Sequence, residues 1–249
     1  MNKVLRLTLG AAAIAVALAS VPTTSNASLV NLGPGSFTPL APEITFDEQP
    51  VGTINPVYNF LAVPGLGNET VSFAGTFMGQ TVTPGPVVTL INHLPTGPLA
   101  LNAAGPQTQI TNDGAPGATS PILSGSPIFN GPISVLFSTP VAAVGLKGGY
   151  FDNAHSTSIE AYDATGASLG ILSNSVTGFE FYGLADASGQ NVISGISFYV
   201  TGDEPAGFEI DDLTFGAAQA VVGTVPESPT WMLAGIGLLG LGALRIKRG

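Results

Sequence analysis

The stretch PISVLFSTPVAAVGLKG, residues 132–148, decides the fold class. It contains two apolar runs, 132–138 and 141–148, which are rich in strand-forming residues and are separated by Thr139 and Pro140. Such runs are typical of β-strands, and the pair between them is typical of a turn. Neither run has the 3.6-residue periodicity of an amphipathic helix. The stretch therefore predicts two consecutive strands.

Similar short runs lie on both sides of this stretch. Residues 158–162 and 168–172 flank the turn sequence Asp163-Ala164-Thr165-Gly166, which predicts a hairpin. Segment 95–130 is dense in turn-forming residues, and we expect it to hold one or two short strands near 108–111. The remaining expected strands are 43–47, 70–77, 87–91, 178–182, 193–200 and 208–215.

The spacing of these runs, at roughly ten residues, predicts an all-β fold. The specific prediction is an antiparallel β-sandwich or jelly roll that spans residues 43–215. We expect residues 28–42 to form a lead-in to this domain. Residues 216–224, GAAQAVVGT, have the composition of a linker.

Charge is distributed unevenly along the chain. The sequence has 16 acidic and 6 basic residues, with a formal net charge of −10. Lys147 is the only basic residue between 28 and 224, and every acidic residue except Glu227 lies in that range. So few cationic groups cannot neutralise phosphates, which excludes nucleic acid as a partner and disfavours anionic lipid headgroups. An acidic surface favours divalent cations or serves solubility alone. The absence of cysteine excludes disulfides and thiol chemistry.

Residues 1–27 have the three parts of a secretory signal peptide. Lys3 and Arg6 supply the basic start, residues 7–19 supply a short apolar core, and Ser25-Asn26-Ala27 supplies small residues at the cleavage site. We expect cleavage after Ala27 by a signal peptidase, following export through the Sec machinery. A retained N-terminal anchor is the alternative, but the apolar run is short for a membrane span.

The C-terminal segment 225–249, VPESPTWMLAGIGLLGLGALRIKRG, also has three parts. A short Pro/Glu/Ser box precedes an uncharged apolar run at about 230–244, and the end is basic. Fifteen helical residues would span roughly 22 Å, less than the ~30 Å hydrocarbon core. Trp231 suits the membrane interface, and long basic side chains at the other end extend the effective length. The sequence predicts a single transmembrane helix with the C-terminus in the cytoplasm, held there by Arg245, Lys247 and Arg248.

This combination of signals closely resembles the PEP-CTERM sorting signal of exopolysaccharide-producing Gram-negative bacteria. Val225, Pro226 and Glu227 match the start of the box, whereas Ser228 replaces the usual second proline and Pro229 follows one position later. The resemblance implies recognition by an exosortase near the Pro-Glu pair. It also implies a transient inner-membrane intermediate, and then release to the cell surface or the extracellular matrix of a biofilm. Shorter matches, such as 44–48, 161–166 and 207–213, resemble the sandwich domains of other proteins with this tail.

Acidic residues near the two ends of the domain predict a calcium site. The first and last strands of a jelly roll often lie side by side, which would gather carboxylates from distant segments. Calcium prefers six to eight oxygen ligands of this kind. Strand alternation offers the opposite expectation, because it turns Asp211 and Asp212 to opposite faces and leaves the carboxylates in solvent. The predicted ligands are Asp47, Glu48, Glu209, Asp211 and Asp212.

The aromatic pair Tyr150 and Phe151 lies between a Gly-Gly pair and a polar loop, where aromatic side chains are suited to stacking on sugars. The two histidines, His93 and His155, belong to no metal-ligand pair, and no nucleophile-elbow motif is present. We therefore expect a protein that is not an enzyme. The primary expectation is a structural or adhesive role in an exopolysaccharide layer. The alternatives are a calcium-stabilised carbohydrate-binding module and, third, a secreted glycan-active enzyme.

Overall fold

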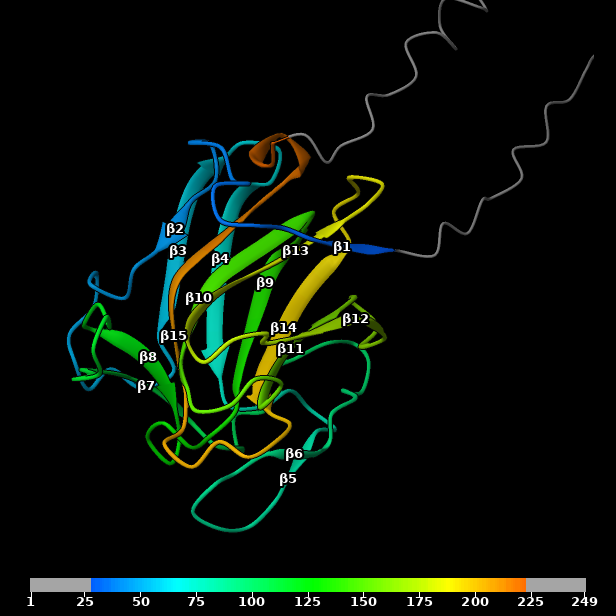
Figure 1. Ribbon diagram of the computed structural model, residues 1–249. Helices are drawn as coiled ribbons and strands as arrows, with labels where there is room; N and C mark the ends of the chain where they lie inside the picture. The colour runs from blue at the N-terminus through cyan, green and yellow to red at the C-terminus, as the bar shows by residue number, and fades with distance from the viewer. Residues whose placement is uncertain (1–27, 223–249) are drawn as a thin grey trace, which may run out of the picture.

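The computed structural model describes residues 28–222, so the predicted signal peptide and the sorting tail lie outside the described residues. The described chain forms two antiparallel sheets packed face to face, with a small hairpin below them (Figure 1). The predicted all-β sandwich is confirmed. Within residues 28–222, no helix has both the length and the apolar character needed to cross a bilayer.

The larger sheet has seven strands. Their order is β1 (Leu29–Asn31), β13 (Gly178–Asp186), β10 (Ala143–Phe151), β15 (Glu209–Gly216), β8 (Ile122–Gly125) and β7 (Thr108–Thr111), and β2 (Glu43–Ile44) also pairs with β15. The pairing of β2 with β15 aligns Ile44 with Leu213. The expected proximity of the first predicted strand to the last is therefore confirmed.

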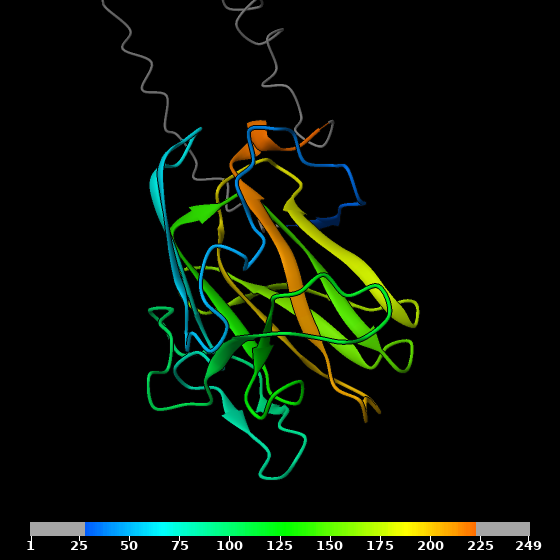
Figure 2. The same ribbon diagram turned by 90° about the vertical axis from the view of Figure 1, so that its left-hand side faces the viewer.

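The second sheet has six strands. Their order is β12 (Ser168–Ser173), β11 (Thr157–Tyr162), β14 (Ile193–Val200), β9 (Ile133–Val141), β4 (Gly67–Ala74) and β3 (Val57–Val63). The separate hairpin consists of β5 (Thr81–Val82) and β6 (Leu90–Asn92), and a short 3₁₀-helix, η1 (Ala218–Ala220), follows β15. Figure 2 shows the domain turned by 90°, with β15 (orange) of the seven-stranded sheet in front.

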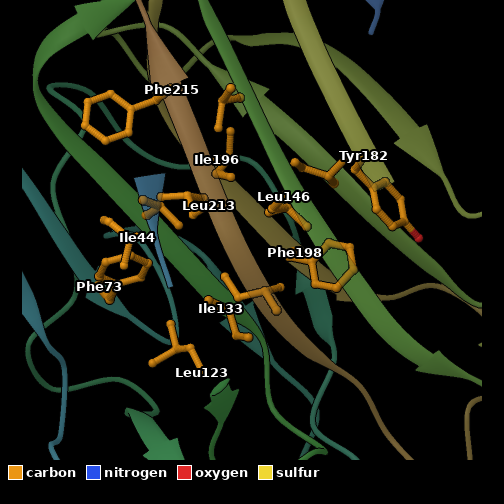
Figure 3. Close-up of a cluster of buried hydrophobic side chains, with 14 of the residues drawn as sticks. Ile44, Phe73, Leu123, Ile133, Leu146, Tyr182, Ile196, Phe198, Leu213 and Phe215 are labelled. Atoms are coloured by element: carbon orange, nitrogen blue, oxygen red, sulfur yellow. The ribbon is translucent and has the colours of Figure 1, made fainter. Parts of the chain in front are cut away.

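The core lies between the two sheets and is built from alternate residues of each strand. Leu146 and Leu213 come from the seven-stranded sheet, and Ile133, Ile196 and Phe198 come from the six-stranded sheet (Figure 3). All five side chains are buried. This apolar contact is the main favourable term in the stability of the sandwich.

The outer face of the six-stranded sheet is also covered. Every residue of β11 and β14 is buried, which strand alternation alone does not predict. The segment between β4 and β7 provides the cover: Phe77 packs edge-on against Tyr162 with ring centroids 5.7 Å apart. Gln80 Nε2 donates a hydrogen bond of 3.1 Å to Ser197 Oγ. The centre of the molecule therefore has three layers rather than two.

The domain is longer than the sequence predicted. Residues 28–42, expected to be a lead-in, contribute β1, which pairs with β13. Residues 216–222, expected to belong to a linker, contain η1, and Phe37 forms a β-bridge with Val221. Val221 is 7% exposed and packs in a small cluster with Leu32. Both segments are part of the packed domain, because β1 extends the seven-stranded sheet beside β13 and Val221 is buried against Leu32.

Candidate functional site

A β-bulge in β15 brings two neighbouring carboxylates to the same face of the sheet. The pairing of β15 with β10 shifts by one residue here, and Asp212 has a φ of 50°, in the left-handed region. Ile210 and Leu213 both point into the core, although strict alternation would separate them. Asp211 and Asp212 therefore both line a cavity on the outer face. The expectation that alternation turns them to opposite faces is wrong, because the bulge adds one residue.

This cavity, which we call the Asp47 cavity, gathers part of the predicted calcium set. Its volume is about 180 Å³, and its lining includes Asp47, Asp211, Asp212 and the hydroxyl residues Thr119 and Ser120. The carboxylates come from opposite ends of the domain, as the sequence predicted. The hydroxyl residues come from the loop between β7 and β8, which crosses the outer face of β15.

Glu48 does not line this cavity. Its Oε1 accepts hydrogen bonds from the backbone N–H and the hydroxyl of Thr45, at 3.2 and 3.0 Å. Glu209 does not line it either, although it lies on the same strand. Among residues 28–222, no group of three or more His, Cys, Asp or Glu side chains is arranged to hold a metal ion.

Asp211 is held by the covering loop. The hydroxyl of Thr119 donates to its Oδ2, and the backbone N–H of Asp212 donates to its Oδ1 at 2.9 Å. Burial raises the pKa of Asp211 to about 6, although these hydrogen bonds act in the opposite direction. The nearby Lys147 points to the loop: its Nζ donates to the carbonyl of Gly117 at 3.3 Å and lies 4.9 Å from the centre of the Phe179 ring.

Glu209 lies in a second, smaller cavity of about 120 Å³, which we call the Glu209 cavity. Its side chain is 2% exposed, and neither carboxyl oxygen receives a hydrogen bond from residues 28–222. The acidic neighbour that lines the same cavity is Asp113. Two carboxylates have no donor between them, so they can form a hydrogen bond only when one is protonated. Burial and the charge of Asp113 raise the pKa of Glu209 to about 9, so Glu209 carries the proton at neutral pH.

The two aromatic residues predicted to bind glycans have different environments. Tyr150 is 42% exposed, lines the Glu209 cavity and packs edge-on against Phe179. Phe151 is fully buried, with its ring against Tyr182 and Phe198 in the core. A buried ring cannot stack on a sugar, so the structure removes Phe151 from the candidate site and leaves Tyr150.

A buried polar network on the other sheet was missed by the sequence analysis. Glu160 of β11 is fully buried, and its Oε2 accepts a hydrogen bond from Tyr199 at 3.0 Å and lies 2.6 Å from His93 Nδ1. The hydroxyl of Tyr162 is 2.9 Å from the same oxygen. Desolvation raises the pKa of both tyrosines, which keeps their hydroxyl protons in place as donors. Alternation put Glu160 on the outer face, but no local signal showed that residues 76–100 cover that face.

Comparisons with known proteins add little to this geometry. No family model matches the chain, and no curated protein matches it. Among solved structures, the enzymatically active domain of tailspike protein 4 from bacteriophage CBA120 is similar at 15% identity, with a TM-score of 0.24. The match covers 78% of this chain and 19% of that chain. A similarity at this level carries no argument about function, so the residues themselves must supply it.

Proposed function

We propose that this chain is an exported surface or matrix protein that carries a PEP-CTERM-type sorting tail, is processed by an exosortase and has a structural or adhesive role in an exopolysaccharide layer. The observation that carries the proposal is the order of the parts within 225–249: a Val-Pro-Glu box, an apolar run and a basic end. The signal peptide at 1–27 supports the same topology, with the domain outside and the C-terminus inside. We assign no catalytic role to the domain.

The proposed route uses the inner membrane only as an intermediate. The predicted apolar run is barely long enough to span the hydrocarbon core, which suits a segment that must hold the protein only until it is cut. The partners of the proposed route are the Sec machinery, signal peptidase and an exosortase. The sandwich is then the cargo that reaches the exopolysaccharide.

The mass of the mature protein tests this route. The full chain is expressed in a host with an exosortase and in the same host without it, and the surface and membrane fractions are analysed by intact-mass spectrometry. With the exosortase, we expect a surface form that has lost the segment ending in Arg248. Without it, the full-length tail stays in the membrane fraction.

The Glu227→Ala variant should accumulate as the unprocessed membrane form, because the resemblance assigns Glu227 to the recognition box. Ser228→Ala is the matched control, since the box already departs from the family pattern at that position. A wild-type surface form that still contains Arg248 would contradict the proposal.

The second candidate function is a calcium-stabilised carbohydrate-binding module. Two observations favour it. Asp47, Asp211 and Asp212 line the Asp47 cavity, and Tyr150 of β10 lines the Glu209 cavity, which also borders β15. Three acidic residues without a salt-bridged partner would be neutralised by a cation with oxygen ligands. The half-exposed ring of Tyr150 in the second cavity offers a stacking surface for a sugar.

Calcium binding and glycan binding are tested separately. Thermal melts in calcium and in EGTA should differ for the wild type and coincide for Asp211→Asn. An identical wild-type midpoint in both conditions would exclude a stabilising calcium site. On a glycan array, Tyr150→Ala should lose the signal, while Ile171→Ala, which alters an exposed residue of β12, should keep it. Silence of the wild type on all polysaccharides counts against the carbohydrate-binding module.

A further inference from the structure

The chain enters and leaves the described domain at the same end of the sandwich. Four segments form the end at which the described chain begins and finishes: 28–42, 60–67, 138–142 and 216–222. The strand register places Leu29 and Gly216 at this end, which we call the exit end (Figures 1 and 2). These four segments contain no charged residue, but acidic groups adjoin them: Asp186 pairs with Leu29, Glu69 accepts a hydrogen bond from the backbone N–H of Thr139, and the exposed Glu43 directly follows residue 42. Acidic residues are placed at the opposite end, in the loops that follow β10 and β14, with Asp152, Asp203 and Glu204.

An apolar groove opens at the exit end. Residues 39–42 and 60–64 line it, and none of them has a polar side chain. Leu61, near the end of β3, is 82% exposed, and Leu40 on the other side of the groove is 51% exposed. Exposed apolar surface that is clustered in this way marks a contact site more often than scattered residues do.

The groove lies beside the point at which the described chain finishes. The backbone N–H of Val222 donates to the carbonyl of Ser36 at 2.7 Å, and that of Thr38 donates to the carbonyl of Ala220 at 2.8 Å. These bonds fix the last described residues against segment 36–38, which leads into the groove. A Cβ on Gly65 would lie 2.4 Å from the Gln219 side chain, so the β3–β4 hairpin is also in contact with this region.

The predicted apolar run begins at about residue 230, only eight residue steps after Val222. Fully extended, eight steps span at most roughly 29 Å. When the tail is inserted in a bilayer, Val222 at the exit end is therefore held within this distance of the start of the embedded run.

We infer that the groove formed by residues 39–42 and 60–64 is a membrane-facing surface, and that Leu61 and Leu40 enter the interfacial layer of the bilayer while the tail is embedded. This inference rests on the proposed function, because insertion of the tail is what brings the groove to the lipid. The contact is apolar, so it depends on the presence of a bilayer and not on its anionic lipid content or on salt. It orients the domain on the membrane before the tail is cut.

The molecule has other exposed apolar residues, which serve as controls. Ile91 is 65% exposed and lies on β6, at the end of the molecule away from η1 (Figure 1). Its exposure is comparable with that of Leu61, but its position is remote from the point at which the tail leaves. A comparison of the two residues therefore separates position from apolar character.

The native chain has no cysteine, so a single introduced cysteine gives a unique labelling site. Leu61→Cys and Ile91→Cys versions of the full chain are labelled with an environment-sensitive fluorophore and reconstituted into phosphatidylethanolamine–phosphatidylglycerol vesicles. We expect the emission at residue 61 to shift to shorter wavelength and to lose quenching by aqueous iodide. The emission at residue 91 should stay at its aqueous value. The result at residue 61 should persist at high salt.

The outcomes separate the inference from the function on which it rests. If the chain does not float with the vesicles, the tail does not insert, and both the proposed function and the inference fail. If the chain floats but residues 61 and 91 give the same aqueous emission, only the inference fails. The last experiment repeats the measurement in nanodiscs that each hold one chain. If the emission shift at residue 61 persists there, it supports contact with lipid. A shift that disappears there would assign the groove to a second copy and overturn the inference.

Discussion

The buried Glu209 of β15 lines the same cavity as the half-buried Asp113, which comes from the loop between β7 and β8. The two carboxyl groups face each other without a salt-bridged basic partner among residues 28–222. Burial and the charge of Asp113 both disfavour the ionised form of Glu209, so the arrangement is most stable when Glu209 is protonated. The contact therefore ties the position of the covering loop to the protonation of one side chain.

The first prediction concerns stability against pH. The pKa of Glu209 is raised from its ordinary value of 4.5 to about 9 in the folded protein, so the fold favours the protonated form. This contribution is fully present below pH 4.5 and is lost as the pH rises toward 9. Within that window the slope approaches about 1.4 kcal/mol per pH unit as an upper limit. Asp211 adds a smaller loss between 3.8 and about 6. We expect the Tm to be higher at pH 5 than at pH 8.

The Glu209→Gln variant tests the origin of this dependence. Glutamine keeps the shape of the protonated acid and cannot ionise, so the Tm of the variant should fall much less between pH 5 and pH 8. Asp203→Asn removes an exposed carboxylate and serves as the control, with the steep wild-type profile retained. Parallel profiles for wild type and Glu209→Gln would show that another group controls the pH dependence.

The second prediction concerns the bulge. Asp212 has a positive φ of 50°, which a β-branched side chain adopts only with strain. Asp212→Val should lower the free energy of unfolding by about 1–3 kcal/mol relative to Asp212→Gly. Urea unfolding measures the difference, and both variants remove the same carboxylate. Equal stability of the two variants would mean that the left-handed conformation at this position is not required.

The third prediction concerns the network around Glu160. Tyr199→Phe removes a hydroxyl that donates 3.0 Å to a fully buried carboxylate, so we expect a loss of about 1.5–3 kcal/mol. Tyr150→Phe makes the same chemical change at a half-exposed position and should cost less than about 0.5 kcal/mol. Chemical denaturation of both variants gives the comparison. A cost for Tyr199→Phe no larger than that for Tyr150→Phe would show that the network contributes nothing to stability.

The fourth prediction concerns a close backbone approach beside the Glu209 cavity. Gly207 has a φ of +86°, and an added Cβ would lie 2.0 Å from the carbonyl oxygen of Phe129. Gly207→Ala should therefore destabilise the domain by more than about 2 kcal/mol, from both strain and overlap. Gly114→Ala places its Cβ in open space and should leave the Tm nearly unchanged. If the two variants melted together, the packing of β15 against Phe129 would have to be looser than the structure indicates.

Much of the fold could be predicted because strand patterns are local. The strand expected near 108–111 is β7, and the strand expected at 193–200 is β14. The hairpin across Asp163 is confirmed: its Oδ1 accepts from the backbone N–H of Thr165 at 2.8 Å, as turn chemistry suggests. β1 and β3 were not predicted. β1 has only three residues and is stabilised by its pairing with β13, which no local pattern reveals.

Less of the candidate site could be predicted, for physical reasons that differ between residues. Asp47 and Asp211 line the same cavity because β2 pairs with β15. The acidic residues in and next to these two segments were enough to predict that carboxylates gather there. Asp113 belongs to a loop whose course over β15 depends on the whole fold, so its sequence carried no sign of the contact. Phe151 was misplaced because the register of β10 against β13 shifts after Gly148. A shift of one residue reverses the face to which a side chain points.

The pairing of β2 with β15 also limits the order in which the domain can assemble. Ile44 and Leu213 are aligned although most of the described chain lies between them. Contacts between such distant residues close late, because the loop entropy must be overcome before the contact contributes. A chain that emerges from its N-terminus cannot complete this sheet until β15 has also emerged. The seven-stranded sheet therefore stays incomplete through most of the synthesis of the described chain, and it can close only after residue 216 has been made.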